Sequence, residues 1–195
     1  MTKKNQQSKQ LKLTNQFLVA SPILNETAFE RSVILVCEHT QDGAMGIVIN
    51  RPTEAKLSEI FLQLKIDFLP NGPGKQTLLS GGPVGPENGF VLHGQDGGAW
   101  KNSLKVSPSL SLTSSRDILE ALAINKGPKH NLITLGYAGW EGQQLEDELM
   151  ENAWLIAPVN DSILFQAPMR ERWELALKSI GISNLYQLSH FHGHA

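Results

Sequence analysis

Two short apolar runs on either side of a turn sequence constrain the fold of this chain more than any other feature. Residues 33–36 and 47–49 are rich in β-branched side chains and too short for helices, so both predict β-strands. Asp42 and Gly43 lie between them and tolerate the positive φ of a tight turn. We therefore expect residues 33–38 and 46–50 to pair antiparallel as a hairpin. Its mouth carries Cys37, Glu38, His39, Asn50 and Arg51.

The rest of the chain mixes further strands with amphipathic helices. Short apolar runs predict strands at residues 17–20, 77–80, 90–93, 132–135 and 154–158, with an extended segment at 104–112. Apolar residues at helical spacing predict helices at residues 57–64, from Ser114 or Ser115 to Gly127, around Leu145 and Leu149, and at 170–180. Pro52 should end the second hairpin strand, because proline cannot donate to a ladder. Strands outnumber helices without regular βαβ spacing, which predicts an α+β or layered α/β fold with a bent, mixed sheet.

Length and charge limit the domain count and the class of partner. The 195 residues fit one domain with a sizeable core. Residues 1–10 are polar and predict a disordered extension, which leaves residues 11–195 as a single domain. The 17 basic and 19 acidic side chains give a formal net charge of −2 without a basic stripe. We therefore expect no specific binding to duplex DNA.

The sequence also predicts where the protein resides. No apolar stretch approaches the roughly 18 residues of a membrane span, and the polar N-terminus is not typical of a secretory signal. Cys37 is the single cysteine, so no internal disulfide can form, and this suits a reducing compartment. These features predict a cytoplasmic protein without a membrane partner.

Cys37 and His39 allow two interpretations. Residues two apart on a regular strand project from the same face, and an imidazolium near a thiol lowers its pKa and produces a reactive thiolate. On this interpretation Cys37 is a candidate catalytic or redox-sensing thiol. Alternatively Cys37, at the end of an apolar run, packs in the core as free cysteines commonly do.

Three other groups of residues carry weaker signals. Gly81 and Gly82 lie in a glycine-rich segment that either presents amides to an anion or forms tight turns between short strands. Rings near glycines pack against backbone or, as the alternative, line a ligand groove: Tyr137, Trp140 and Trp154. The carboxylates of a short helix are expected on its solvated face: Glu146, Asp147, Glu148 and Glu151.

Neither a metal nor a cofactor is predicted. His190, His192 and His194 alternate near the C-terminus, but no cysteine or carboxylate completes a metal site there. The glycine-rich segment matches neither the phosphate-binding loop nor the dinucleotide fingerprint, both of which need a following helix.

Four motifs in order resemble the signature of the bacterial YqgE/AlgH family. They are Cys37-Glu38-His39 with residues 43–52, Gly81-Gly82-Pro83-Val84 with Val91-Leu92-His93, residues 135–140, and Gly142-Gln143 with Leu145-Glu146. The resemblance covers the chain from about Leu13 onward. It implies a compact α+β domain with a bent, barrel-like sheet and flanking helices. One branch of this largely uncharacterised family is linked to control of alginate production and is labelled a transcriptional regulator.

Three functions follow as hypotheses, and none assigns a reaction. The first is a binding or regulatory module that recognises a protein or small ligand; the others are a thiol enzyme or redox sensor using Cys37, and a DNA-binding regulator, which the charge disfavours. The predicted binding surface joins strand ends with a glycine turn and one ring: Glu38, His39, Asn50, Arg51, Gly81, Gly82, His93 and Trp140. Arg51 could pair with Glu38 as a structural clamp.

Overall fold

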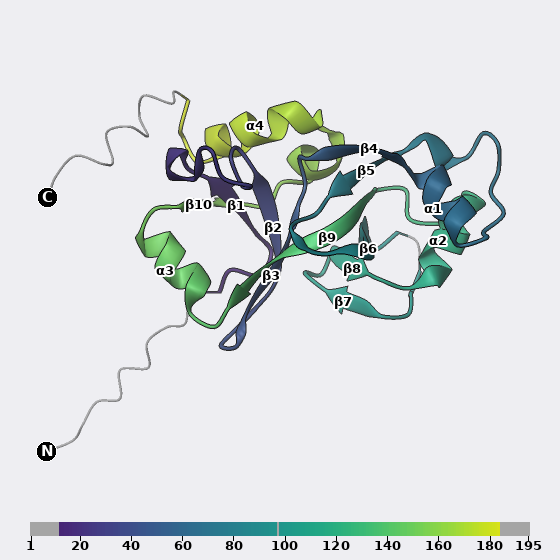
Figure 1. The fold of residues 1–195 in the computed structure, drawn as a ribbon, viewed down its shortest axis with the longest axis horizontal. Coiled ribbons are helices and arrows are strands. Elements are labelled where there is room, and N and C mark those ends of the chain that lie inside the picture. The colour runs from purple at the N-terminus through teal and green to yellow at the C-terminus, as the bar shows by residue number, and fades with distance from the viewer. Residues whose placement is uncertain (1–11, 97, 184–195) are drawn as a thin grey trace, which may run out of the picture.

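A computed structural model describes residues 12–96 and 98–183 (Figure 1). Ten strands in this part of the chain form one sheet: β1 (Gln16–Ala20), β2 (Val33–Thr40), β3 (Gly43–Val48), β4 (Pro52–Lys56), β5 (Thr77–Ser80), β6 (Val84–Gly94), β7 (Ser103–Lys105), β8 (Leu110–Thr113), β9 (Asn131–Glu141) and β10 (Trp154–Pro158). The α-helices are α1 (Leu57–Gln63), α2 (Arg116–Ala123), α3 (Gln144–Met150) and α4 (Arg172–Ser179). Short 3-10 turns lie at Pro22–Leu24, Pro73–Lys75 and Met169–Glu171, and a π-helical turn lies at Ser162–Gln166.

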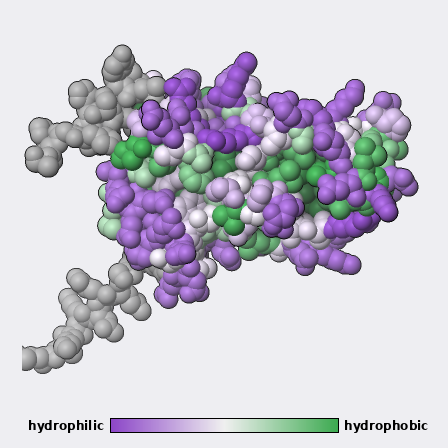
Figure 2. Space-filling model, in the orientation of Figure 1, coloured by the Kyte–Doolittle hydropathy of each residue, from purple (hydrophilic) through white to green (hydrophobic). Residues whose placement is uncertain are grey.

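The sheet is mixed and bent, which confirms the predicted α+β class. Its main order is β10-β1-β2-β3-β9-β6-β8-β7, with antiparallel neighbours, while β5 pairs parallel with β9 and antiparallel with β4. Helices α3 and α4 flank the half that contains β10, β1, β2 and β3, and α1 and α2 lie at the far end of the other half (Figure 1). In the view of Figure 2, hydrophobic side chains gather mainly on the half with α1 and α2.

Strand β9 joins the two halves of the sheet. Its residues from Asn131 to Leu135 pair with β6, and those from Ala138 to Glu141 pair with β3. Gly136 lies between the two segments with φ +71°, and a Cβ there would lie 2.5 Å from the Gly82 carbonyl oxygen. Glycine is therefore required where the strand passes from one half to the other.

Three clusters of buried side chains stabilise this arrangement. The central core lies between the two halves and under α4, and includes Leu35 and Leu92. The α3 core, with Ile34 and Trp154, covers the opposite face of β2, and the α1–α2 core includes Phe61 and others from the second half. Alternate residues of β2 enter different cores, so this strand is buried on both faces, as its continuous apolar run requires.

The predicted hairpin is confirmed, and two details of the prediction are corrected. Ile34 pairs with Val48 and Leu35 with Ile47, antiparallel as expected. Pro52 does not only end a strand, since it begins β4, where a missing N–H is tolerated at the first residue of a strand. The segment 104–112 is not continuously extended, because β7 and β8 pair as a hairpin.

Two predictions concern residues that the structure does not describe, and a third concerns membrane-spanning helices. The proposed disordered extension at residues 1–10 and the histidines at 190, 192 and 194 are not described by the structure. Among the residues that it does describe, no helix has the length and apolar character needed to cross a membrane.

Candidate functional site

A β-bulge in β2 separates Cys37 from His39. Val36 pairs with Gly46 and Glu38 with Met45, so Cys37 is an extra residue that interrupts the alternation of side chains. Cys37 packs in the central core. His39 lies on the other face against α3, with its Nε2 3.0 Å from Glu146 Oε1. The prediction that Cys37 and His39 share a face is therefore wrong, and the bulge is the reason.

The environment of Cys37 is that of a packing residue. Its side chain is 1% exposed, and its Sγ lies 3.6 Å from the Leu35 carbonyl oxygen. Burial, with a smaller contribution from the charge of Glu38, raises the pKa of the thiol to about 12. The thiol is therefore protonated at neutral pH, and the geometry favours packing over thiolate chemistry.

Two carboxylates of α3 face the sheet instead of solvent, which corrects the expected solvated face. Glu146 contacts His39, as described above. Glu148 Oε2 accepts hydrogen bonds from the indole N–H groups of Trp140 and Trp154, at 2.9 and 2.7 Å. A buried indole needs an acceptor, and two tryptophans beside an acidic helix are the sequence signal for this arrangement. Both glutamates therefore fasten α3 to the sheet.

Three of the other predicted site residues have structural contacts. His93 is 2% exposed and lies between the Gly94 carbonyl oxygen and the Thr113 hydroxyl, at 2.7 and 2.8 Å. Gly81 accepts from the Val48 N–H and donates to the Leu135 carbonyl, both at 2.8 Å. A Cβ on Gly82 would lie 2.1 Å from the Tyr137 carbonyl carbon. The glycine pair therefore allows the backbone to pass close to β9.

The remaining predicted residues divide between the two ends of the hairpin. Glu38 pairs with Met45 near the turn, whereas Asn50 and Arg51 follow the far end of β3. Asn50 comes five residues after Met45, which corresponds to roughly 16 Å of extended chain. A single site is therefore ruled out, and the predicted clamp between Arg51 and Glu38 is wrong. Each end of the hairpin instead borders a cavity of its own.

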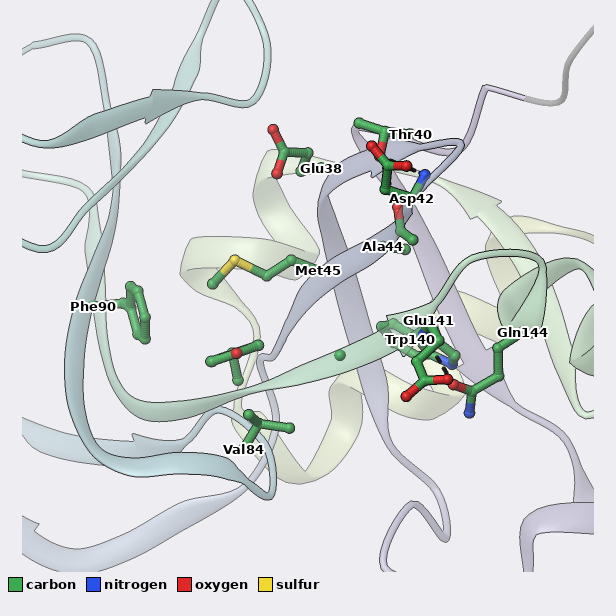
Figure 3. A pocket seen from close by; sticks show the side chains of 13 residues that line it. Glu38, Thr40, Asp42, Ala44, Met45, Val84, Phe90, Trp140, Glu141 and Gln144 are labelled. Carbon is green, nitrogen blue, oxygen red and sulfur yellow. Dashed lines mark hydrogen bonds between the residues drawn. The ribbon is translucent and has the colours of Figure 1, made fainter.

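The first cavity is an open groove of about 820 Å³ where β3 and β9 meet, here called the junction groove (Figure 3). Its floor is apolar and aromatic: Met45, Val84, Phe90 and Tyr137. The rings of Phe90 and Tyr137 meet edge to face with centroids 6.0 Å apart, and both pack on the central core. Trp140 belongs to the lining, although its ring is buried in the α3 core.

Gly139 creates the hollow in this groove. Tyr137, Gly139 and Glu141 alternate along β9 and so share a face, and Gly139 pairs with Met45 of β3. A Cβ at Gly139 would lie 3.3 Å from the Tyr137 ring and 3.7 Å from a Val84 methyl group, so a larger side chain at this position would have to project into the groove.

The rim of the junction groove is acidic. Glu38, Asp42 and Glu141 contribute carboxylates, and all three residues are exposed. The described residues that line the groove include no lysine, arginine or histidine. An apolar floor beneath an uncompensated negative rim is complementary to a ligand that combines positive charge with apolar surface.

The second cavity, of about 500 Å³, lies at the open end of the hairpin and is here called the arginine pocket. Its lining is mostly polar: Glu30, Arg31, Asn50, Arg51, Pro52, Ser80, Arg170, Trp173 and Glu174. Asn50 closes the loop before β2 onto the hairpin, since its Oδ1 accepts from the Val33 N–H and its Nδ2 donates to the Arg31 carbonyl, both at 2.9 Å. Arg51 donates to the Glu30 carbonyl at 2.8 Å.

Sequence reasoning found Glu38, Trp140, Asn50 and Arg51 but missed most of the residues that shape the two cavities. The sequence indicates Tyr137 as a ring near glycines. Gly139, Met45 and Phe90 carry no chemical signal of their own, because only the register of β3, β6 and β9 brings them together. In the described part of the chain, no three His, Cys, Asp or Glu side chains come together as metal ligands.

Comparison with known proteins identifies the family. The model of the AlgH-like family (DUF179) matches residues 17–185. A UPF0301 protein of Xanthomonas campestris pv. campestris is 48% identical over 183 residues, which are 94% of this chain and 96% of the relative. The solution structure of the AlgH protein from Pseudomonas aeruginosa superposes with a TM-score of 0.77 at 42% identity, covering 97% of this chain and 99% of that one. A crystal structure of protein DIP2367 from Corynebacterium diphtheriae has the same fold, with a TM-score of 0.66 at 20% identity over 86% of this chain and 87% of that one. The resemblance seen in the sequence motifs is confirmed, and the chain belongs to the AlgH-like family.

Proposed function

We propose that the protein is a binding module that holds a positively charged segment of a partner protein in the junction groove. The observation that carries the proposal is the pairing of an apolar floor with an acidic rim that has no basic side chain in its lining. A regulatory role of the kind that the family resemblance implies would act through this partner.

The chemistry of the groove favours lysine or arginine next to an apolar residue. Glu38, Asp42 and Glu141 attract the cation, and the half-buried rings of Phe90 and Tyr137, which line the groove, offer cation–π contacts to it. Met45 and Val84 then remain to cover the apolar part of the ligand. Specific binding to duplex DNA is not expected here, because the acidic rim repels phosphates.

The shape of the groove favours a segment of chain over a compact small molecule. Small-ligand sites usually enclose most of the ligand surface. The junction groove is open, and the side chains that line it come from the β2–β3 hairpin and from β6 and β9 (Figure 3). An extended peptide can lie along such a groove while its ends continue into the partner.

Fluorescence anisotropy with two labelled hexapeptides tests this proposal. Both peptides contain two leucines and a phenylalanine, and the other three residues are lysines in one peptide and glutamates in the other. We expect the lysine peptide to bind and to shift the amide resonances of Met45, Gly139 and Glu141. We expect affinity to fall as salt is raised, because the rim charges are exposed.

Matched variants locate the interaction. Glu38→Gln combined with Glu141→Gln should weaken binding about fivefold, since exposed charge pairs contribute up to about 1 kcal/mol. Gly139→Leu should abolish binding by filling the groove. Glu54→Gln removes the same kind of charge from β4, outside the groove lining, and should leave the affinity unchanged. Equal affinity for both peptides, or equal binding by the double variant and Glu54→Gln, would contradict the proposal.

A further inference from the structure

We infer that the arginine pocket is a binding site for the phosphate monoester group of a small molecule. This site is separate from the junction groove and does not depend on the function proposed for it. Three observations carry the inference. Two arginines of the pocket have no acidic partner among the described residues, a buried arginine lies behind the pocket, and the volume of the pocket suits a small molecule.

Two of the guanidinium groups in the pocket have no acidic partner. Arg51 donates one hydrogen bond to a backbone carbonyl, and the Cζ of Arg31 lies 5.4 Å from the centroid of the Trp173 ring. Within residues 12–96 and 98–183, neither arginine forms an ion pair with a carboxylate. Arginine presents donors in a fork that matches phosphate oxygens, so these side chains are available to an oxyanion.

The position of Arg31 is fixed by the backbone. Its φ is +50°, in the left-handed region, and its carbonyl is held by Asn50. Stacking on Trp173, whose own indole N–H donates to the Ala20 carbonyl at 2.9 Å, restricts the side chain further. The guanidinium of Arg31 is therefore placed at the pocket in advance, which lowers the entropic cost of binding an anion.

A fourth arginine lies behind the pocket. Arg172 is 3% exposed, and its guanidinium donates to the carbonyls of Ile49 and Ala167, the first of which adjoins Asn50. It forms no ion pair with any carboxylate in the described residues. Burial lowers the pKa of Arg172 to about 10, so it remains charged at neutral pH. A buried cation without a counterion favours an anion nearby.

The net charge of the pocket favours an anion. Arg31, Arg51 and Arg170 line the pocket together with Glu30 and Glu174, Arg172 adds a positive charge behind it, and Glu171 pairs with Arg170 at 3.5 Å. Four positive charges against three negative ones leave a net charge of +1, and the forked donors of Arg31 and Arg51 suit the oxygens of a phosphate monoester. The cavity of about 500 Å³ lies within the range of small-molecule sites, with the Trp173 ring beside the cations.

Titration of the ¹⁵N-labelled protein with four probes tests the inference. The probes are inorganic phosphate, phenyl phosphate, benzoate and sodium chloride at matched ionic strength. We expect both phosphates to shift the amides of Arg31, Asn50 and Arg51 and the indole resonance of Trp173. Phenyl phosphate should bind more tightly than inorganic phosphate, benzoate more weakly than either, and chloride should leave these resonances unchanged.

Arg31→Gln is the decisive variant, because within the described part of the chain the Arg31 side chain contacts the Trp173 ring and holds the loop by no hydrogen bond of its own. We expect it to weaken phenyl phosphate binding about tenfold. Arg116→Gln, which removes an arginine from α2 that pairs with Glu120, should leave the affinity unchanged. Equal effects of phosphate and chloride, or equal affinity of the two variants, would overturn the inference. Either of these results would overturn the phosphate site alone, because the proposal of peptide binding at the junction groove is tested separately.

Discussion

The junction groove and the arginine pocket lie at opposite ends of one hairpin and carry opposite charges. The groove is formed on regular strands, where Gly139 leaves a hollow between Met45 and Tyr137. The arginine pocket is formed by a loop, the end of β3 and the start of α4, fixed mainly through backbone carbonyls. The comparison shows that a hairpin can separate two sites whose residues are close in the sequence, because each residue of strand adds about 3.3 Å.

The two sites also differ in how their charges are supported. The acidic side chains of the groove are exposed and need no protein partner. The pocket, in contrast, lies next to the buried guanidinium of Arg172, whose hydrogen-bond partners within residues 12–96 and 98–183 are carbonyl oxygens. An anion bound in the pocket should therefore stabilise the fold more than a cation bound in the groove, because the anion lies near a buried guanidinium that has no counterion among the described residues.

Gly136→Ala should have the largest effect, because it disturbs the bend that both halves of the sheet share. A Cβ at this position would lie 2.5 Å from the Gly82 carbonyl oxygen, and alanine disfavours a φ of +71°. We expect the free energy of unfolding to fall by about 3 kcal/mol in urea denaturation.

Gly139→Ala is the matched control on the same strand. Its Cβ would meet the Tyr137 ring at 3.3 Å, which a small rotation of the ring relieves. We expect this variant to lose less than about 1 kcal/mol. Equal losses for the two variants would show that Gly136 is not the site where the strand must bend.

Arg172→Met should have the next largest effect and distinguishes the two sites. Methionine keeps much of the buried volume but leaves the Ile49 and Ala167 carbonyls without their donor, so we expect a loss of about 2 kcal/mol. The rise in melting temperature produced by phenyl phosphate should shrink, while lysine-peptide binding at the groove should persist. A variant as stable as the parent would show that the buried arginine contributes no net stability.

Glu38→Lys should sharpen the contrast through a change in binding alone. Reversal of one rim charge should weaken the lysine hexapeptide about tenfold, or about 1.4 kcal/mol, because attraction becomes repulsion. The affinity for phenyl phosphate should not change, because Glu38 lines the junction groove and does not line the arginine pocket. A comparable loss of phosphate binding would mean that the two sites are coupled through the hairpin.

Local patterns in the sequence were sufficient for most of the fold but for only a few residues of each cavity. The hairpin follows from two β-branched runs and an Asp-Gly turn, and helix α1 from apolar residues at helical spacing. The bulge at Cys37 is not encoded by a local pattern, because it depends on how β2 fits against β3 and the cores on both sides. Regular alternation therefore placed Cys37 beside His39 incorrectly.

The same limit explains the site residues that the sequence did not indicate. Glu38 and Arg51 were selected for their chemistry, which the sequence displays. The hollow at Gly139 and the unpaired state of Arg31 depend on strand register and on the loop that Asn50 holds. Contacts between segments far apart in the chain determine these features, and one sequence does not contain them as a pattern.

The last prediction is that His39→Ala has no effect on the labelling of Cys37, and it tests the bulge in β2. If Cys37 and His39 lie on opposite faces of β2, His39→Ala should leave the rate of iodoacetamide labelling of Cys37 in the folded protein unchanged. The rate itself should be very slow at neutral pH and rise only toward pH 12, because burial keeps the thiol protonated. In urea the thiol should label rapidly in both proteins, which confirms that access limits the folded rate. Faster labelling of the parent than of His39→Ala at neutral pH would show that the imidazole activates the thiol, and would restore the thiol chemistry that the geometry argues against.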